Sequence, residues 1–220
     1  MRFARWNRLP ALGVGLLVLG CGGGGGGGGG TGPPGPPTQL VKSGGDGQSW
    51  YFNNPLPMPY SVTVRDASNR AVPSVSVDWA ITTGGGTLST DPSTTNSSGV
   101  ATTVHALGSA STYVVTATVT GLPSVTFSAG ASAPPTSAAV SVRDNFFTPS
   151  SVAIQTGGTV TWTWAGAEVH NVTISGPTPR PPDAPNRTTG THQGTFTTVG
   201  TYNYTCTNHV GMNGSVTVVN

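Results

Sequence analysis

Residues 201–220 read TYNYTCTNHVGMNGSVTVVN, and this stretch indicates the fold of the C-terminal half of the chain. Apolar and polar residues alternate through its first six positions, as they do in a half-buried strand. Tyr202, Tyr204 and Cys206 therefore share one face, so the thiol is expected to point toward the interior with the two rings. Alternation returns in SVTVV at 215–219, which predicts a second strand.

The connection between these two strands carries metal-binding chemistry. Cys206, His209 and Met212 place a thiolate, an imidazole and a thioether within seven residues. A second imidazole, His170, stands in the segment EVHNVTIS on a different expected strand. One thiolate and two imidazoles with a weak axial thioether form the ligand set of a blue-copper centre. A zinc site is disfavoured, because structural zinc usually has more Cys ligands and Met is not a usual zinc ligand.

This part of the chain resembles the cupredoxins, the group of plastocyanin, pseudoazurin and amicyanin. The Cys-x-x-His-x-x-Met spacing is most similar to the amicyanin type, and Gly-Thr-Tyr-x-Tyr-x-Cys precedes it while Gly-x-Val-x-Val follows it. The resemblance implies an all-β Greek-key sandwich over residues 138–220. It also implies that Asn171 links the two ligand loops, with Thr207 as its expected partner. By the same resemblance one type 1 copper ion would be held by His170, Cys206, His209 and Met212.

The other strands of residues 138–220 alternate as well. Val160, Trp162 and Trp164 share one face of an expected strand, which favours a role in the core. Residues 175–194 are rich in proline and are predicted to form a loop, in which His192 is expected to be exposed and without a role in metal binding.

The first 21 residues have the features of an export signal. Residues 1–8 carry three Arg, and residues 9–20 form an apolar run too short to span a bilayer, so residues 1–20 are predicted to be a signal peptide. The end of that run, Val18-Leu19-Gly20-Cys21, resembles a bacterial lipobox. The resemblance implies a lipid on Cys21 and a place in the bacterial cell envelope, on the periplasmic or cell-surface side. Gly22 in place of Asp favours the outer membrane if the cell is Gram-negative. The alternatives are an ordinary signal peptide and a Cys21–Cys206 disulfide.

Two segments lie between the expected signal peptide and the cupredoxin-like residues 138–220. Residues 21–39 contain nine consecutive glycines and a proline-rich continuation, which predict a tether. Residues 40–133 contain about seven short strands with Gly, Asn, Asp or Pro between them, a pattern that predicts a sandwich. This segment resembles bacterial Ig-like domains of the invasin/intimin type. Trp79 is expected in its core, and His105 is expected to be structural or on the surface. The resemblance implies a spacer or an adhesive module.

Composition limits the classes of function. Charged residues make up only 7% of the chain, while Gly numbers 33 and Pro 19. Without the three Arg of the expected signal peptide, six basic and seven acidic side chains remain, so the sequence offers no basic surface for nucleic acid.

The leading hypothesis is therefore a lipid-anchored carrier of single electrons that is not an enzyme, with an unidentified redox protein docking on the apolar patch around His209, Val210 and Gly211. A copper storage, delivery or sensing protein and a surface adhesion protein are the alternatives. A multicopper enzyme is disfavoured, because only His105 and His192 remain as further imidazoles.

Overall fold

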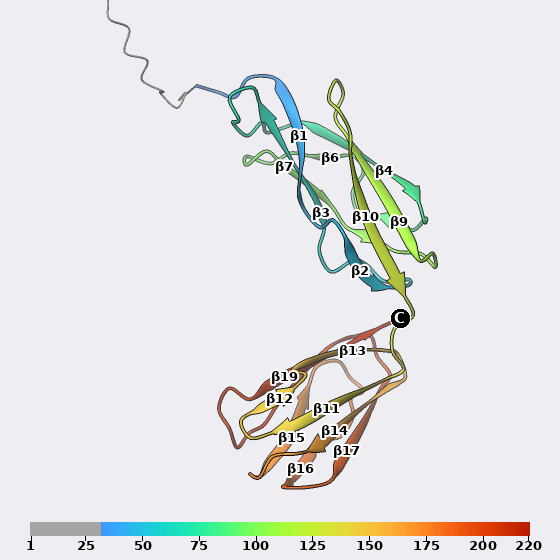
Figure 1. Cartoon of the computed structure of the whole chain (residues 1–220), viewed down its shortest axis with the longest axis vertical. Coiled ribbons are helices and arrows are strands. Elements are labelled where there is room, and N and C mark those ends of the chain that lie inside the picture. The colour runs from blue at the N-terminus through green and yellow to red at the C-terminus, as the bar shows by residue number, and fades with distance from the viewer. Residues whose placement is uncertain (1–31) are drawn as a thin grey trace, which may run out of the picture. The chain divides into compact units, whose positions relative to one another are not determined.

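The computed structural model describes residues 32–220, and these residues contain 19 strands and no helix (Figure 1). The all-β fold expected from the sequence is therefore confirmed. No segment of this part of the chain forms a helix of the length and apolarity needed to cross a bilayer. The expected signal peptide and Cys21 lie outside the described residues.

The first sandwich packs a three-stranded sheet on a five-stranded sheet. The smaller sheet has the order β1-β3-β7 and consists of β1 (Pro37–Gly44), β3 (Tyr60–Asp66) and β7 (Val100–Thr103). The larger sheet has the order β2-β10-β9-β4-β6 and consists of β2 (Gln48–Tyr51), β10 (Val125–Ser132), β9 (Thr112–Thr118), β4 (Ser76–Thr83) and β6 (Ser93–Thr94). A short separate ladder joins β5 (Thr87–Leu88) to β8 (His105–Ala106).

Aromatic side chains fill the centre of this first sandwich. Trp79 is buried against Phe127, with ring centroids 5.8 Å apart, and its indole N–H donates a hydrogen bond to Ser93 Oγ at 2.8 Å. The expected core position of Trp79 is confirmed. His105 is also buried here, and its ring meets Tyr113 edge to face at 5.3 Å.

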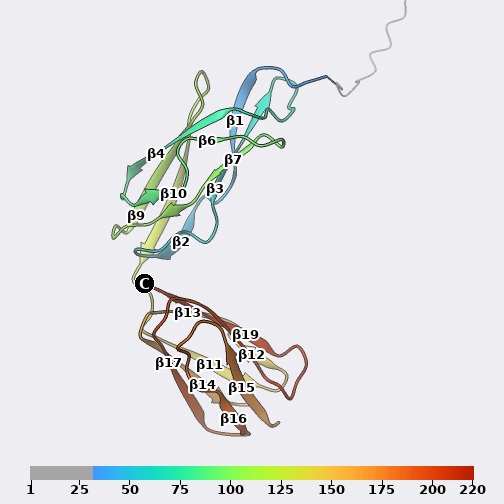
Figure 2. The same ribbon diagram turned by 180° about the vertical axis from the view of Figure 1, so that it is seen from behind.

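The second sandwich contains residues 137–219 and packs a four-stranded sheet on a five-stranded sheet (Figures 1 and 2). The first sheet has the order β12-β11-β14-β17 and consists of β12 (Phe146–Thr148), β11 (Ser137–Arg143), β14 (Gly158–Trp164) and β17 (Thr191–Phe196). The second has the order β13-β19-β18-β15-β16 and consists of β13 (Ser151–Gln155), β19 (Asn213–Val219), β18 (Gly200–Thr205), β15 (His170–Ser175) and β16 (Ala184–Arg187).

Alternation along the strands places the core residues of the second sandwich. Trp162 on β14 has no exposed surface, and Tyr204 on β18 packs edge to face against it with centroids 5.4 Å apart. Cys206, one position beyond β18, is 3% exposed and belongs to the same buried cluster. The expected inward face of Tyr202, Tyr204 and Cys206 is thus present in the structure.

One expectation about this sandwich is wrong. The proline-rich stretch 175–194 is not only a loop, because it contains β16 and the start of β17. Strand β16 includes Pro185 and lies at the edge of its sheet, where a residue without an N–H is tolerated. Gly194 lies in β17, where a Cβ would come within 2.8 Å of Pro181, so this glycine permits close approach of the two segments. In this stretch, Pro185 therefore marks an edge strand, and Gly194 marks a close contact between β17 and Pro181.

Candidate metal centre

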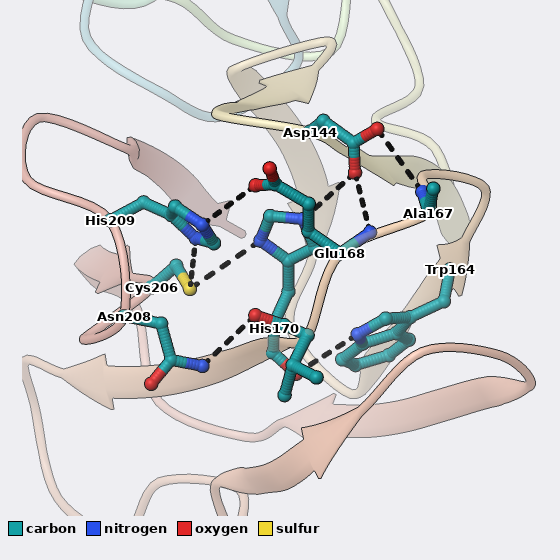
Figure 3. Close-up of polar contacts among 9 residues, drawn as sticks. Asp144, Trp164, Ala167, Glu168, His170, Cys206, Asn208 and His209 are labelled. Carbon is teal, nitrogen blue, oxygen red and sulfur yellow. Dashed lines mark hydrogen bonds and ion pairs between the residues drawn. The ribbon is translucent and has the colours of Figure 1, made fainter.

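Three metal-binding side chains converge between β15 and the connection from β18 to β19 (Figure 3). The Sγ atom of Cys206 lies 3.6 Å from Nδ1 of His170 and 3.5 Å from Nδ1 of His209. The ligand atoms of the three residues all lie within 4.8 Å of one another. Cys206 and His170 are buried, while the side chain of His209 is 20% exposed. The cluster is therefore closed on the inside and reaches the surface through one imidazole.

Met212 stands at the far end of the loop that begins at Cys206. Its side chain is 1% exposed and belongs to the same hydrophobic cluster as Cys206. The loop is closed by the Cys206 N–H, which donates to the Met212 carbonyl at 3.0 Å. Gly211 has a φ of 85°, a left-handed conformation that glycine adopts without strain. Three of the four expected ligand residues thus lie on one closed loop between neighbouring strands.

His170 is held from another strand of the same sheet. It is the first residue of β15, and its carbonyl accepts a hydrogen bond from the Trp164 indole at 3.0 Å. The next residue, Asn171, reaches the ligand loop: its Nδ2 donates to Thr207 Oγ1 at 2.7 Å, and its Oδ1 accepts from the Thr207 N–H at 2.9 Å. Asn186 Oδ1 accepts hydrogen bonds from Asn171 and from Asn208 of the loop, each at 2.9 Å. Amide side chains therefore link β15, β16 and the ligand loop.

Two carboxylates face the outer nitrogens of the imidazoles. Asp144 Oδ1 lies 3.3 Å from His170 Nε2, and Glu168 Oε2 lies 2.9 Å from His209 Nε2 (Figure 3). Hydrogen bonds from the backbone N–H groups of Glu168 and Ala167 lower the pKa of Asp144, and the contact with His170 adds to this effect. Asp144 is therefore a carboxylate throughout the neutral pH range.

The spacing of the donor atoms suits a metal ion. An ion bonded to a thiolate at about 2.3 Å and to an imidazole nitrogen at about 2.0–2.1 Å holds those two atoms about 3.5–3.8 Å apart at an angle of about 105–120°. The two observed separations, 3.6 and 3.5 Å, agree with this value. One thiolate with two imidazoles is a soft donor set that suits copper, whereas Mg²⁺ and Ca²⁺ prefer oxygen. The residues present therefore fit a copper ion.

Sequence reasoning named part of this arrangement and missed another part. The structure brings His170, Cys206 and His209 together, buries Met212 in the same hydrophobic cluster as Cys206 and joins Asn171 to Thr207. It places His192 away from the cluster, half-buried with its ring 6.0 Å from that of Trp162. Asp144, Glu168 and Asn186 were missed. The sequence did offer one signal for the two carboxylates. The chain has only seven acidic residues, and Glu168 stands two positions before the candidate ligand His170.

Two segments of the chain match known protein families. Residues 53–132 match the bacterial Ig-like domain (group 1), and residues 136–219 match the copper binding proteins of the plastocyanin/azurin family. None of the curated proteins matches the chain.

Several solved structures are similar to part of the chain. A reduced Cu(I) form of an amicyanin mutant is 27% identical over 38% of this chain and 82% of its own, with a TM-score of 0.32. A purple cupredoxin from Nitrosopumilus maritimus is 25% identical over 37% of this chain and 99% of its own, with a TM-score of 0.34. A pseudoazurin from Sinorhizobium is 24% identical over 38% of this chain and 74% of its own, with a TM-score of 0.33.

Proposed function

Because this chain joins a bacterial Ig-like domain to a copper-binding domain of the plastocyanin/azurin family, we propose that it is an extracytoplasmic carrier of single electrons, anchored to a membrane by a lipid on Cys21. The family and the donor set agree on one type 1 copper ion as the cofactor. The observation that carries the proposal is the buried Sγ atom of Cys206, which lies within 3.6 Å of two imidazole nitrogens that approach from different segments.

Each candidate ligand has a distinct role in this proposal. Cys206 would lose its thiol proton on binding a metal and would supply a thiolate, while His170 and His209 would each supply Nδ1. Met212 would supply a weak thioether donor that tunes the reduction potential. Bound copper supplies the one-electron chemistry by alternating between Cu(I) and Cu(II). Strands β15, β18 and β19 hold the donors in place, so little rearrangement is needed when the charge of the site changes.

Electrons would enter and leave at the His209 edge. His209 is the partly exposed ligand, and next to it Val210 is fully exposed while Val169 is 46% exposed. We propose that an unidentified redox protein docks on this apolar patch through a small and weak interface, as suits a transient electron-transfer complex. The small exposed edge also explains why the carrier would not release its metal readily, which distinguishes it from a delivery protein.

The envelope location rests on the N-terminal sequence. The signal peptide of residues 1–20 and the lipobox-like end at Cys21 support a lipid anchor, and residues 21–39 would act as the tether. The Ig-like domain would then be a spacer between the tether and the copper domain. Growth of the cells with labelled fatty acid should label the wild-type chain and leave Cys21→Ser unlabelled, and equal labelling of both would contradict the anchor.

The copper site is tested by spectroscopy of the full chain after addition of Cu(II). An intense thiolate-to-copper absorption band that makes the protein blue, with narrow copper hyperfine splitting in EPR, is the expected result. The reduced and oxidised forms should interconvert by one electron without consuming a substrate. A colourless protein, or an ordinary tetragonal copper spectrum, would overturn the proposed function.

A further inference from the structure

Acidic side chains are few in this domain, and most of them lie at the metal centre. The whole chain contains seven acidic residues, and only Asp144, Glu168 and Asp183 lie between residues 137 and 220. Two of these three face the outer nitrogens of the two imidazoles that meet Cys206, one carboxylate for each ring (Figure 3). The third, Asp183, accepts the Ile174 N–H at 2.8 Å instead. Each imidazole therefore has a carboxylate behind it.

Asp144 is held in its place by groups other than His170. Its Oδ1 accepts the Glu168 N–H at 2.9 Å, and its Oδ2 accepts the Ala167 N–H at 3.1 Å. Gly166 makes this approach possible, because a Cβ at that position would overlap Asp144 Oδ1 and come within 2.7 Å of the Asp144 nitrogen. The carboxylate is therefore fixed by the loop 166–168 before any metal binds.

The same loop delivers the second carboxylate. Asp144 fixes the backbone of Glu168, and the side chain of Glu168 then spans to the ligand loop, where Oε2 meets His209 Nε2. The two contacts differ in their surroundings. In the first contact His170 is fully buried and Asp144 is 41% exposed, whereas in the second His209 is 20% exposed and Glu168 is 53% exposed. Solvent therefore screens the Glu168 contact more strongly than the Asp144 contact.

A carboxylate decides which ring nitrogen carries the proton. A neutral imidazole has one N–H and one lone pair, and an ionised carboxylate can only accept a hydrogen bond. With a carboxylate at Nε2, the proton stays on Nε2 and the lone pair stays on Nδ1, the atom that faces Cys206 Sγ in both residues. The negative charge behind each ring also stabilises the more positive oxidation state of a bound ion.

We propose that Asp144 and Glu168 are the positioning residues of this metal centre: they present the Nδ1 lone pairs of His170 and His209 toward Cys206 and lower the reduction potential of the bound ion. The inference rests on the proposed copper site, and it goes further by assigning the proton positions and the charge around it. Asp144 contributes more than Glu168, because its partner imidazole His170 is fully buried, whereas both partners of the Glu168 contact are partly exposed to solvent.

The first test needs no copper. Long-range ¹H–¹⁵N NMR of the metal-free full chain at about pH 8 reports which ring nitrogen of His170 carries the proton. Wild type and Asp144→Asn should show Nε2–H, because the Asn carbonyl still accepts the hydrogen bond. Asp144→Ala should lose this preference and show a clear Nδ1–H population. If Asp144→Ala keeps the wild-type tautomer, the positioning role of Asp144 is wrong.

The second test measures copper-loaded protein. Asp144→Ala should bind copper about 10–100-fold more weakly than wild type, the loss typical of removing a carboxylate behind a ligand imidazole. Asp144→Asn keeps the hydrogen bond and loses the charge, so its preference for Cu(I) over Cu(II) should rise about tenfold, which is a potential increase of about 59 mV for one electron. Glu168→Gln should shift the potential in the same direction by a smaller amount.

Asp183→Asn is the matched control, because it removes one negative charge from the same domain at a residue that contacts neither imidazole. Its potential should stay close to that of wild type. Equal potentials for Asp144→Asn and Asp183→Asn, or a larger shift for Glu168→Gln than for Asp144→Asn, would overturn the assignment. A wild-type protein that binds no copper would contradict the proposed function instead, and the NMR comparison of the metal-free variants would still decide the role of Asp144.

Discussion

Asn171 and Thr207 are joined by two hydrogen bonds that connect the strand of one candidate ligand to the loop of the other three. Asn171 Nδ2 donates to Thr207 Oγ1 at 2.7 Å, and the Thr207 N–H donates to Asn171 Oδ1 at 2.9 Å. Each residue directly follows a candidate ligand, His170 or Cys206. The pair therefore controls the distance between two segments that are 36 residues apart in the sequence.

We expect substitutions of Asn171 and Thr207 to lower the stability of the domain by different amounts. Asn171→Ala removes both hydrogen bonds to Thr207 and the one to Asn186, and should lower the free energy of unfolding by about 1–3 kcal/mol, since each neutral hydrogen bond contributes about 0.5–1.5 kcal/mol. Thr207→Val removes only the hydroxyl acceptor and should cost less. Denaturant unfolding of the metal-free chain, with the rate of copper loss as a second measurement, checks this. Equal stability of Asn171→Ala and wild type would contradict the linking role.

Cys206→Ser should abolish the blue band while leaving the domain folded. The substitution removes the thiol that faces the two imidazoles and changes one buried atom, so its cost in stability should be about 1 kcal/mol. Visible absorption after addition of Cu(II) and circular dichroism of the same sample separate the two effects. A surviving intense band would show that the thiolate of Cys206 is not the ligand.

Met212→Leu should raise the reduction potential and keep the blue colour. The thioether donates weakly to the ion, so its loss disfavours Cu(II), while Leu fills a similar volume at a cost below about 1.5 kcal/mol. Redox titration followed at the blue band measures the shift. An unchanged potential would mean that the buried Met212 side chain packs in the core without influencing the ion.

Gly166→Ala should reproduce the effect of losing Asp144 without changing any charge. A Cβ at residue 166 overlaps the Asp144 carboxylate, so Asp144 and the loop must separate, at a cost of about 1–3 kcal/mol. The tautomer of His170 in the metal-free chain should then shift as it does in Asp144→Ala. If the NMR signal of His170 is unaffected while the stability falls, Gly166 matters for packing alone.

His105 predicts that the Ig-like domain weakens in acid. Burial lowers the pKa of His105 below its ordinary value of 6.5, so the unfolded chain takes up a proton that the folded domain resists. The contribution of neutral His105 to the free energy of unfolding is therefore complete above pH 6.5 and is lost as the pH falls below that value. The unfolding constant should rise by at most about tenfold for each pH unit. Hydrogen exchange of β9 at pH 7.5 and 5.5 measures this.

The matched variants for this pH effect are His105→Leu and His192→Gln. His105→Leu should remove the extra opening at pH 5.5, because no group that titrates in this range then remains at the site. His192→Gln changes an imidazole of the other sandwich and should keep the pH dependence of β9. A dependence that persists unchanged in His105→Leu would assign it to another group.

Alternation and motif spacing were sufficient to predict the cores and the donor set. The period of two along 159–164 and 201–206 placed Trp162, Tyr204 and Cys206 inside, because a strand has only two faces. The contacts of Asp144 could not be predicted in this way. They depend on the parallel pairing of β11 with β14 and on a turn at Asn145, which together bring Asp144 to a loop more than 20 residues later. Local patterns carry no information about such distant pairings.

The ligand loop is closed at its base, so its sequence can change without a change in the sheet that carries it. The register of β18 and β19 pairs Thr205 with Asn213, immediately outside the loop, and the Cys206 N–H bonds to the Met212 carbonyl just inside it. Residues 208–211 therefore lie outside both the sheet pairing and the Asn171–Thr207 link, so their number and sequence can vary without a change in the register of β18 and β19. The scaffold and the redox properties of the site can consequently evolve, or be engineered, as separate modules.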